Sequence, residues 1–209
     1  MSHIAAFDAA FATCPLIAIL RGVRPDEVEE IGEALVGAGY TLIEVPMNSP
    51  DPLESVSRLA LRFAGRAVIG AGTVLREDQV AAVSAAGGTM IISPNANLRV
   101  ISASAAAGLV SLPGIATPSE AFAAIEAGAT ALKLFPAEAA SPAVVKAMRA
   151  VLPKETRLLP VGGIAPGTMA PWTAAGAAGF GLGSALYKPG MSAAEVSTNA
   201  RAFIEVLSG

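Results

Sequence analysis

Residues 131–136, Ala131-Leu132-Lys133-Leu134-Phe135-Pro136, form one of the short apolar runs that decide the fold. Including this run, eight comparable runs lie about 20 to 27 residues apart. The other seven begin near Leu16, Leu42, Val68, Met90, Val110, Leu158 and Gly179. Each run is continuously apolar rather than alternating, which is typical of parallel strands covered on both faces. Together the runs predict eight strand-plus-helix units.

The segments between the runs carry helix signals. Pro25-Asp26-Glu27 is expected to open a helix that buries Val28, Ile31 and Leu35. Two capping boxes predict further helix starts, at Thr117-Pro118-Ser119-Glu120 and at Ser192-Ala193-Ala194-Glu195. The pair Ser141-Pro142 predicts another helix, which is expected to carry Val151.

Eight such units in 209 residues predict an α/β fold, namely a (β/α)₈ TIM barrel that forms a single domain over residues 1–209. Within residues 1–14, Phe7 and Phe11 lie four residues apart and predict an N-terminal helix that caps the barrel. A doubly wound open sheet is the competing architecture. Its dinucleotide fingerprint is missing, because Gly70-Ala71-Gly72 is followed by Leu75 where a third glycine is needed.

Composition limits the classes of partner. The formal net charge is −3 and no block of Lys or Arg occurs, so we expect no nucleic-acid partner and no membrane partner. Residues 158–187 are uncharged, but three prolines interrupt them, and they are interpreted as buried strands and turns rather than as a membrane span. No secretory signal is visible, and the expected location is cytoplasmic.

The single Cys14 and the single His3 limit the chemistry further. One cysteine excludes an internal disulfide, and no His/Cys metal cluster can be assembled from these two residues. We therefore expect no metal and no cofactor, with Cys14 as a buried apolar residue.

In a barrel, the active site lies where the strands end. The residues at these exits include one amine, one carboxylate and one guanidinium, and they are Arg21, Glu44 with Asn48, Thr73, Pro94 with Asn95, Pro113, Lys133, Gly162 with Gly163, and Gly183 with Ser184.

Lys133 and Glu44 are the candidate catalytic residues. A charged side chain in an apolar strand is costly unless it is paired or used. Dry surroundings favour a neutral amine, which a lysine needs in order to attack a ketone and form a Schiff base. A structural ion pair between the two residues, or exposure of both at strand ends, is the alternative interpretation.

Two pairs of small residues follow the last two strands, where barrels commonly hold a phosphate on main-chain N–H groups. These pairs are Gly162-Gly163 and Gly183-Ser184, and the Ser184 hydroxyl can add a donor. Glycines that merely turn the chain are the alternative.

Five ordered blocks of the sequence resemble the class I aldolases that cleave 2-keto-3-deoxy-6-phospho sugar acids. The resemblance runs from about Pro15 to Phe203, and the blocks are 16–22 (LIAILRG), 43–50 (IEVPMNSP), 69–74 (IGAGTV), 131–136 (ALKLFP) and 161–164 (VGGI). It implies a homotrimeric barrel lyase that needs no metal. Pro46-Met47-Asn48-Ser49-Pro50 and Ser93-Pro94-Asn95 are similar to the galactonate-type members, which implies cleavage of 2-dehydro-3-deoxy-6-phosphogalactonate to pyruvate and D-glyceraldehyde 3-phosphate.

The roles expected from chemistry and resemblance together are as follows. Lys133 attacks the C2 ketone, and Glu44 moves protons through a water. Substrate-binding roles are expected for Arg21 at the carboxylate or a hydroxyl, Asn48 at the C4 hydroxyl, Thr73 and Pro94 at the pyruvate end, and Phe135 at the imine methylene.

Three alternatives remain open. The first is the gluconate-type aldolase, whose substrate differs only at C4. The second is a phosphate-binding barrel enzyme without a Schiff base, such as an isomerase or a thiamine-phosphate-synthase-like transferase. The third is a noncatalytic phosphate-metabolite binder.

Overall fold

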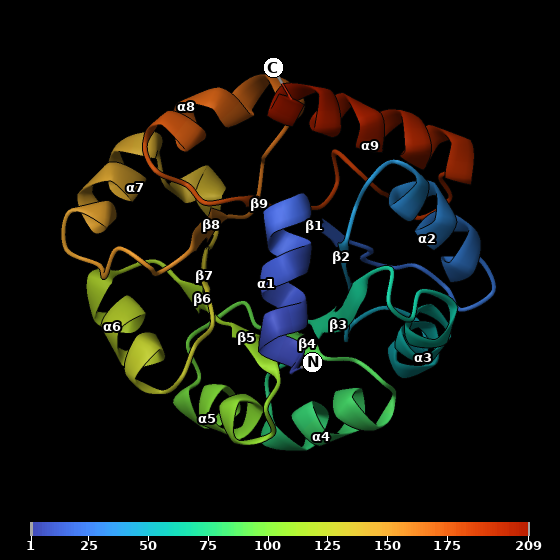
Figure 1. The fold of residues 1–209 in the computed structure, drawn as a ribbon, viewed down its shortest axis with the longest axis horizontal. Coiled ribbons are helices and arrows are strands. Elements are labelled where there is room, and N and C mark those ends of the chain that lie inside the picture. Colours follow the sequence, from blue (N-terminus) through green and yellow to red (C-terminus); the bar gives the residue numbers. More distant parts are fainter. Residues whose placement is uncertain (1, 209) are drawn as a thin grey trace.

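Parallel strands alternate with helices along the chain, and the strands lie inside a ring of helices (Figure 1). The computed structural model describes residues 2–208, so Met1 and Gly209 of the predicted domain lie outside the described residues. The strands are β1 (Leu16–Ile19), β2 (Leu42–Pro46), β3 (Val68–Gly72), β4 (Met90–Ile92), β5 (Val110–Leu112), β6 (Gly114–Ile115), β7 (Leu132–Leu134), β8 (Leu158–Pro160) and β9 (Phe180–Leu182).

Helix α1 precedes the first strand, and the other helices lie between or after the strands. They are α1 (His3–Thr13), α2 (Val28–Gly37), α3 (Pro52–Arg62), α4 (Glu77–Ala85), α5 (Leu98–Ala106), α6 (Pro118–Glu126), α7 (Pro142–Arg149), α8 (Met169–Ala174) and α9 (Ala193–Ser208), with short 3₁₀ helices η1 (Ala137–Ala139) and η2 (Pro166–Thr168).

The strands form two curled parallel sheets, with strand orders β5-β4-β3-β2-β1-β9 and β6-β7-β8. A single parallel bridge between Val161 and Gly181 joins the end of β8 to β9. The fifth predicted run is interrupted at Pro113, which separates β5 from β6 because proline has no N–H to donate to a strand ladder. Its carbonyl still accepts a hydrogen bond from the Lys133 N–H at 2.9 Å.

The buried apolar side chains divide between the two faces of the curled sheets. One cluster lies between the strands and the outer helices and includes Ile43 and Val45. The other cluster contains the alternate residues Leu42, Val68 and Leu159, together with Phe7 and Phe11 of α1. This second cluster fills the interior, since alternate residues of a strand point to opposite faces.

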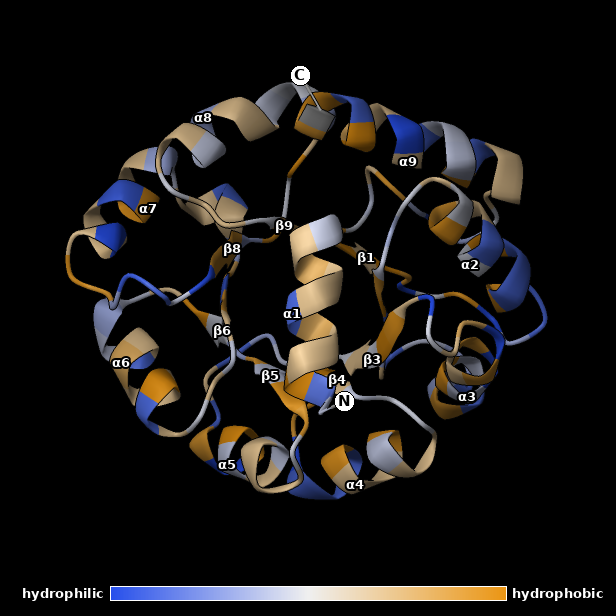
Figure 2. Cartoon of the chain, viewed as in Figure 1, coloured by the Kyte–Doolittle hydropathy of each residue, from blue (hydrophilic) through white to orange (hydrophobic). Residues whose placement is uncertain are grey.

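Helix α1 covers the end of the interior at which the strands begin, as predicted. It crosses in front of the strands in Figure 1, and most of its surface is apolar in Figure 2. Thr41, which precedes β2, donates to the Ala10 carbonyl at 2.8 Å, and Arg157, which precedes β8, pairs with Asp8 at 2.6 Å. The opposite end, where the strands finish, is therefore the one left for a site.

Several local predictions are confirmed. Both capping boxes form, at Thr117 and at Ser192, and Cys14 is buried. Residues 158–187 fold as β8, η2, α8 and β9. Within residues 2–208, no helix combines the length and the apolarity that a membrane crossing requires.

Two helix predictions are wrong in detail. Residues 25–27 form a turn, and α2 begins at Val28. Helix α7 ends at Arg149, so Val151 lies beyond it and is 55% exposed. The chain turns there because the Arg149 guanidinium donates to the carbonyls of Pro153 and Thr156.

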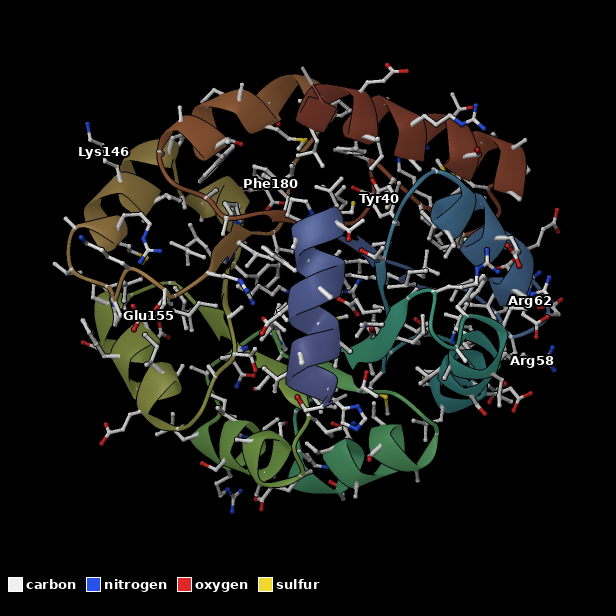
Figure 3. The ribbon with its side chains drawn as sticks, viewed as in Figure 1. Tyr40, Arg58, Arg62, Lys146, Glu155 and Phe180 are labelled. Carbon is white, nitrogen blue, oxygen red and sulfur yellow. The ribbon has the colours of Figure 1, made fainter. Side chains whose placement is uncertain are left out.

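The residues labelled in Figure 3 contrast the outside of the ring with its inside. Figure 3 shows Arg58, Arg62 and Lys146 at the periphery, whereas Tyr40 and Phe180 lie inside the ring of helices. Tyr40 is fully buried and burial raises its pKa, and its hydroxyl has no hydrogen-bond partner within the described part of the chain.

Candidate active site

Lys133 and Glu44 both occupy interior positions of their strands. Glu44 lies two residues after Leu42, and Lys133 lies two residues after Ala131, and both of these apolar residues belong to the interior cluster. Because side chains two apart on a strand share a face, the amine and the acid point into the same interior. Both lie closer than Leu42 and Ala131 to the end at which the strands finish.

The interior holds these two groups in nearly dry surroundings. Lys133 is 6% exposed and Glu44 is 1% exposed. The Lys133 amine lies 4.6 Å from the centre of the Phe135 ring, a cation–π geometry. Among the ion pairs of residues 2–208, none joins Lys133 directly to Glu44, so the predicted alternative of a structural ion pair does not describe this arrangement.

A small cavity connects the two groups. Its volume is about 10 Å³, and it is lined by both Glu44 and Lys133 together with apolar side chains such as Ile17 and Leu159. This volume is close to the minimum that holds one water molecule. Glu44 Oε2 is buried and has no hydrogen-bond partner among the described residues.

Glycines of β3 make room for the Glu44 carboxylate. Gly70 and Gly72 continue the interior face after Val68, and Gly70 lies directly opposite Glu44 in the ladder. A Cβ atom added at Gly72 would coincide with the Glu44 carboxylate. The acid therefore lies over the Gly72 backbone, in space that any larger residue would fill.

Burial shifts the pKa of each of the two groups in the direction that favours its neutral form. It raises the pKa of Glu44 to about 7, although the charges of Lys133 and Arg21 oppose this shift. It lowers the pKa of Lys133, and while the Glu44 charge opposes that shift, the Arg21 charge adds to it. Each group can therefore exchange a proton near neutral pH more readily than an exposed counterpart.

A larger cavity of about 380 Å³ opens from Lys133 toward the ends of the strands. Seven of the predicted site residues line it: Arg21, Lys133, Phe135, Gly162, Gly163, Gly183 and Ser184. Glu44 lines the small cavity below it, and Lys133 lines both cavities. Asn48, Thr73 and Pro94 are not among the residues that line either one.

The glycine pairs present main-chain donors to the larger cavity. Gly162 and Gly163 have positive φ values of 111° and 66°, which favour glycine. Within the described chain, the N–H groups of Gly163, Ile164 and Ser184 make no hydrogen bond to a protein acceptor. Ile164 is buried, whereas Gly163 and Ser184 are exposed to the cavity, and free main-chain donors of this kind bind anions well, phosphate included.

Arg21 is anchored by the loop after β2. Its Nη1 donates to Oδ1 of Asn48 at 2.6 Å, and the neighbouring Gly22 N–H donates to the Ser49 hydroxyl at 2.9 Å. Asn48 thus contacts a cavity residue without lining the cavity. A direct contact of Asn48 with a substrate hydroxyl, as predicted from the sequence, stays a prediction.

Thr73 and Pro94 lie at the strand exits but outside the two cavities. Thr73 follows β3 with a positive φ of 56°. Pro94 lies against Gly114, because a Cβ added there would collide with the Pro94 carbonyl. Their expected place at the pyruvate end stays a prediction.

Two charged residues of the larger cavity escaped the sequence analysis. Glu138 follows β7 in η1, and Lys188 follows β9, and both line the cavity as exposed side chains. Both residues lie within five positions of a predicted site residue, Lys133 or Ser184, and this closeness could have indicated them. They were not predicted because only the first residues after each strand were considered.

Metal ligands do not gather in the part of the chain that the structure describes. Over residues 2–208, the side chains of His, Cys, Asp and Glu form no group of three or more suited to hold a metal ion. The charged groups of the cavity are instead an amine, a guanidinium and carboxylates.

Comparisons with known proteins agree with this geometry. A probable 2-dehydro-3-deoxy-6-phosphogalactonate aldolase of Rhizobium meliloti (strain 1021) is 47% identical over 89% of this chain and 88% of its own length. The 2-dehydro-3-deoxy-6-phosphogalactonate aldolase of Escherichia coli (strain K12) is 44% identical over 91% of this chain and 93% of its own length. A solved structure described as native KDPGal superimposes with a TM-score of 0.91 at 43% identity, covering 93% of this chain and 94% of that one.

The family profile extends over nearly the whole chain. The sequence profile for the aldolases described as KDPG and KHG aldolase matches residues 7–202, a range that includes most of α1, all the strands and most of α9. The chain belongs to the KDPG and KHG aldolase family.

Proposed function

We propose that this protein is a class I aldolase that cleaves 2-dehydro-3-deoxy-6-phosphogalactonate to pyruvate and D-glyceraldehyde 3-phosphate. The observation that carries the proposal is the position of the Lys133 amine, which is buried in the interior beside Glu44 and lies at the base of a cavity whose walls carry free main-chain donors. Its relatives at 44% and 47% identity support the galactonate-type substrate.

In the first step, the Lys133 nitrogen attacks the C2 ketone and forms a carbinolamine. An ordinary lysine is neutral in only about one molecule in 2500 at pH 7. Burial of Lys133 raises that fraction by lowering the pKa. Loss of water then gives the protonated imine, and the Glu44 carboxyl supplies the proton for the departing hydroxyl through a water in the small cavity.

In the second step, the C3–C4 bond breaks. Glu44 accepts the proton of the C4 hydroxyl, the C4 carbon becomes the aldehyde, and the bonding electrons move into the imine to form an enamine. Glu44 then returns the proton to C3, and hydrolysis of the resulting imine releases pyruvate and the free lysine. A carboxyl with a pKa of about 7 can perform both transfers at neutral pH.

The phosphate and the carboxylate of the substrate require separate anchors. We place the phosphate on the main-chain donors after β8 and β9, with Lys188 as an exposed cation beside them. Arg21 binds the substrate carboxylate or a hydroxyl with its remaining donors, since one already bonds Asn48. Phe135 contacts the imine methylene from beside the Lys133 amine.

The same proposal includes the architecture. We infer that the two curled sheets act as one closed eight-stranded barrel in a single domain over residues 1–209. The Val161–Gly181 bridge and the continuity of β5 and β6 through Pro113 support this inference. The family resemblance supports a homotrimer, and Leu98 and Phe122, on the neighbouring helices α5 and α6, are each exposed by more than 40% and are candidates for its interface. Light scattering of the purified protein tests the trimer.

The function is tested by comparing the two C4 epimers as substrates. The release of pyruvate is measured with 2-dehydro-3-deoxy-6-phosphogalactonate and with its gluconate epimer. The proposal expects cleavage with a higher kcat/KM for the galactonate. A strong preference for the gluconate epimer would mean that the protein is a gluconate-type aldolase. The absence of cleavage for both epimers would refute the aldolase assignment.

A further inference from the structure

Glu138 occupies the place where the anion site lies. It follows β7 in η1 and is exposed to the larger cavity. A Cβ added at Gly162 would coincide with the Glu138 carboxylate, and one added at Gly163 would lie 2.8 Å from Glu138 Cγ. The acidic side chain therefore lies directly over both glycines of the first pair.

The Glu138 carboxylate forms no direct ion pair within the described part of the chain. Among the ion pairs and side-chain hydrogen bonds of residues 2–208, none involves Glu138. The nearby main-chain N–H groups of Gly163 and Ile164 also lack protein acceptors. A negative charge without a partner thus lies beside free donors that suit an anion, and the two features occupy the same space.

A phosphate group bound on these donors would meet this carboxylate at close range. Like charges a few ångströms apart repel each other, and the repulsion is only partly screened at the edge of a cavity. The exposed side chain can rotate away, but its charge stays near the site. Lys188 and Arg21, which line the same cavity, oppose the effect, but neither forms an ion pair with Glu138 among the described residues.

We propose that Glu138 is a specificity-determining residue that weakens the binding of phosphorylated ligands by occupying the anion site of the free protein. The inference rests on the proposed function for the identity of its ligand. It predicts that the acid makes the site less selective for phosphorylated over unphosphorylated aldehydes than its donors alone would make it. An affinity limit of this kind would favour the release of a phosphorylated product.

The matched variants are Glu138→Gln and Glu155→Gln. The first keeps the shape of the side chain and removes its charge. The second makes the same change in net charge at the opposite end of the strands, in the turn before β8, away from both cavities. Glu138→Ala adds a variant that also removes the bulk of the side chain. Folding of each variant is checked by circular dichroism.

The first measurement uses inorganic phosphate alone, by titration calorimetry of the full chain without substrate. Glu138→Gln and Glu138→Ala should bind phosphate roughly tenfold more tightly than the parent protein, because one nearby unit charge is removed. Glu155→Gln should match the parent. Unchanged or weaker phosphate binding in both Glu138 variants would overturn the proposal. This result is independent of aldolase activity, so it is distinguishable from a failure of the proposed function.

The second measurement uses the aldol direction, with pyruvate and either D-glyceraldehyde 3-phosphate or D-glyceraldehyde. The ratio of kcat/KM for the phosphorylated aldehyde to that for the unphosphorylated one should rise roughly tenfold in Glu138→Gln. A ratio that stays constant or falls would show that Glu138 assists the substrate instead, and would overturn the proposal.

Discussion

Two carboxylates in this protein each lie over a glycine of another segment, but only one of them is buried. Glu44 lies over Gly72 and is 1% exposed, whereas Glu138 lies over Gly162 and faces the open cavity. Burial raises the pKa of Glu44 to about 7 beside an amine. A glycine thus makes room for an acid at two places. We propose proton transfer for the acid in dry surroundings and an effect on anion binding for the acid at the open cavity.

The largest effect on kcat is expected from replacing Glu44, the buried one of the two acids. Glu44→Gln keeps the shape and removes the proton acceptor, so kcat for cleavage should fall by roughly 10² to 10⁴, the usual range for a general acid–base. Steady-state assays with the galactonate substrate check this, and Glu155→Gln serves as the control. A Glu44→Gln variant within fivefold of the parent protein would remove Glu44 from the mechanism.

The pH dependence of stability should follow the buried acid. Because the pKa of Glu44 is raised from 4.5 to about 7, the folded protein holds this proton more tightly than the unfolded chain does. The resulting stabilisation is complete below about pH 4.5 and is lost as the pH rises through about 7, and it amounts to about 3 kcal/mol.

This contribution is measured by urea unfolding at about pH 5 and pH 8. The free energy of unfolding of the parent protein should fall between the two conditions by roughly 2 to 3 kcal/mol more than that of Glu44→Gln, because a small part of the stabilisation is already lost at pH 5. Equal changes in both proteins would mean that Glu44 titrates like an exposed acid.

Replacement of Gly72 should move the Glu44 carboxylate without preventing the protein from folding. Gly72→Ala places a methyl group where the carboxylate lies, and the φ angle at Gly72 is not positive, so the backbone admits alanine. Displacement of the acid by about 1 Å should lower kcat roughly 10²-fold. Gly37→Ala, in α2 with no atom near the added Cβ, is the matched control and should stay near the parent value.

A double-mutant cycle identifies the cause. Glu44→Asp withdraws the carboxylate by one methylene, so Gly72→Ala should cost less in that background than in the parent protein. Additive effects of the two substitutions would point to a general distortion of β3 instead of a collision with the acid.

The smallest effect is expected where Asn48 anchors Arg21. Asn48→Ala removes one hydrogen bond of 2.6 Å from an exposed guanidinium, so KM should rise roughly fivefold, equivalent to about 1 kcal/mol, with a smaller change in kcat. Steady-state kinetics measure both parameters. A large fall in kcat at constant KM would instead indicate that Asn48 reads the reacting C4 hydroxyl.

Much of this arrangement could be predicted from the sequence. The apolar runs place Lys133 and Glu44 on strands. Because the runs are apolar throughout, they do not show which face each side chain takes, and the interior placement comes from the structure. Capping boxes and the glycine pairs are local patterns, and in natural proteins local patterns usually agree with the final fold. The family follows from five ordered blocks, and the profile match over residues 7–202 confirms it.

The remainder depends on contacts between segments that are distant in the sequence. Nothing near Asn48 indicates that its side chain bonds Arg21, since the contact requires the register of β1 against β2. The overlap of Glu138 with Gly162 likewise requires the positions of η1 and the loop after β8. Helix α7 ends at Arg149, whose side chain donates hydrogen bonds to two carbonyls beyond the helix, and helix propensities do not account for such contacts.

The central claim is that the buried amine is the nucleophile, and the chain offers a stringent test of it. The sequence has four lysines, at positions 133, 146, 154 and 188, and Lys188 lines the same cavity as Lys133. The protein is reduced with borohydride in the presence of pyruvate, and the modified peptide is located by mass spectrometry. We expect a single stable adduct on Lys133 with loss of activity. An adduct on Lys188, or no adduct, would contradict it.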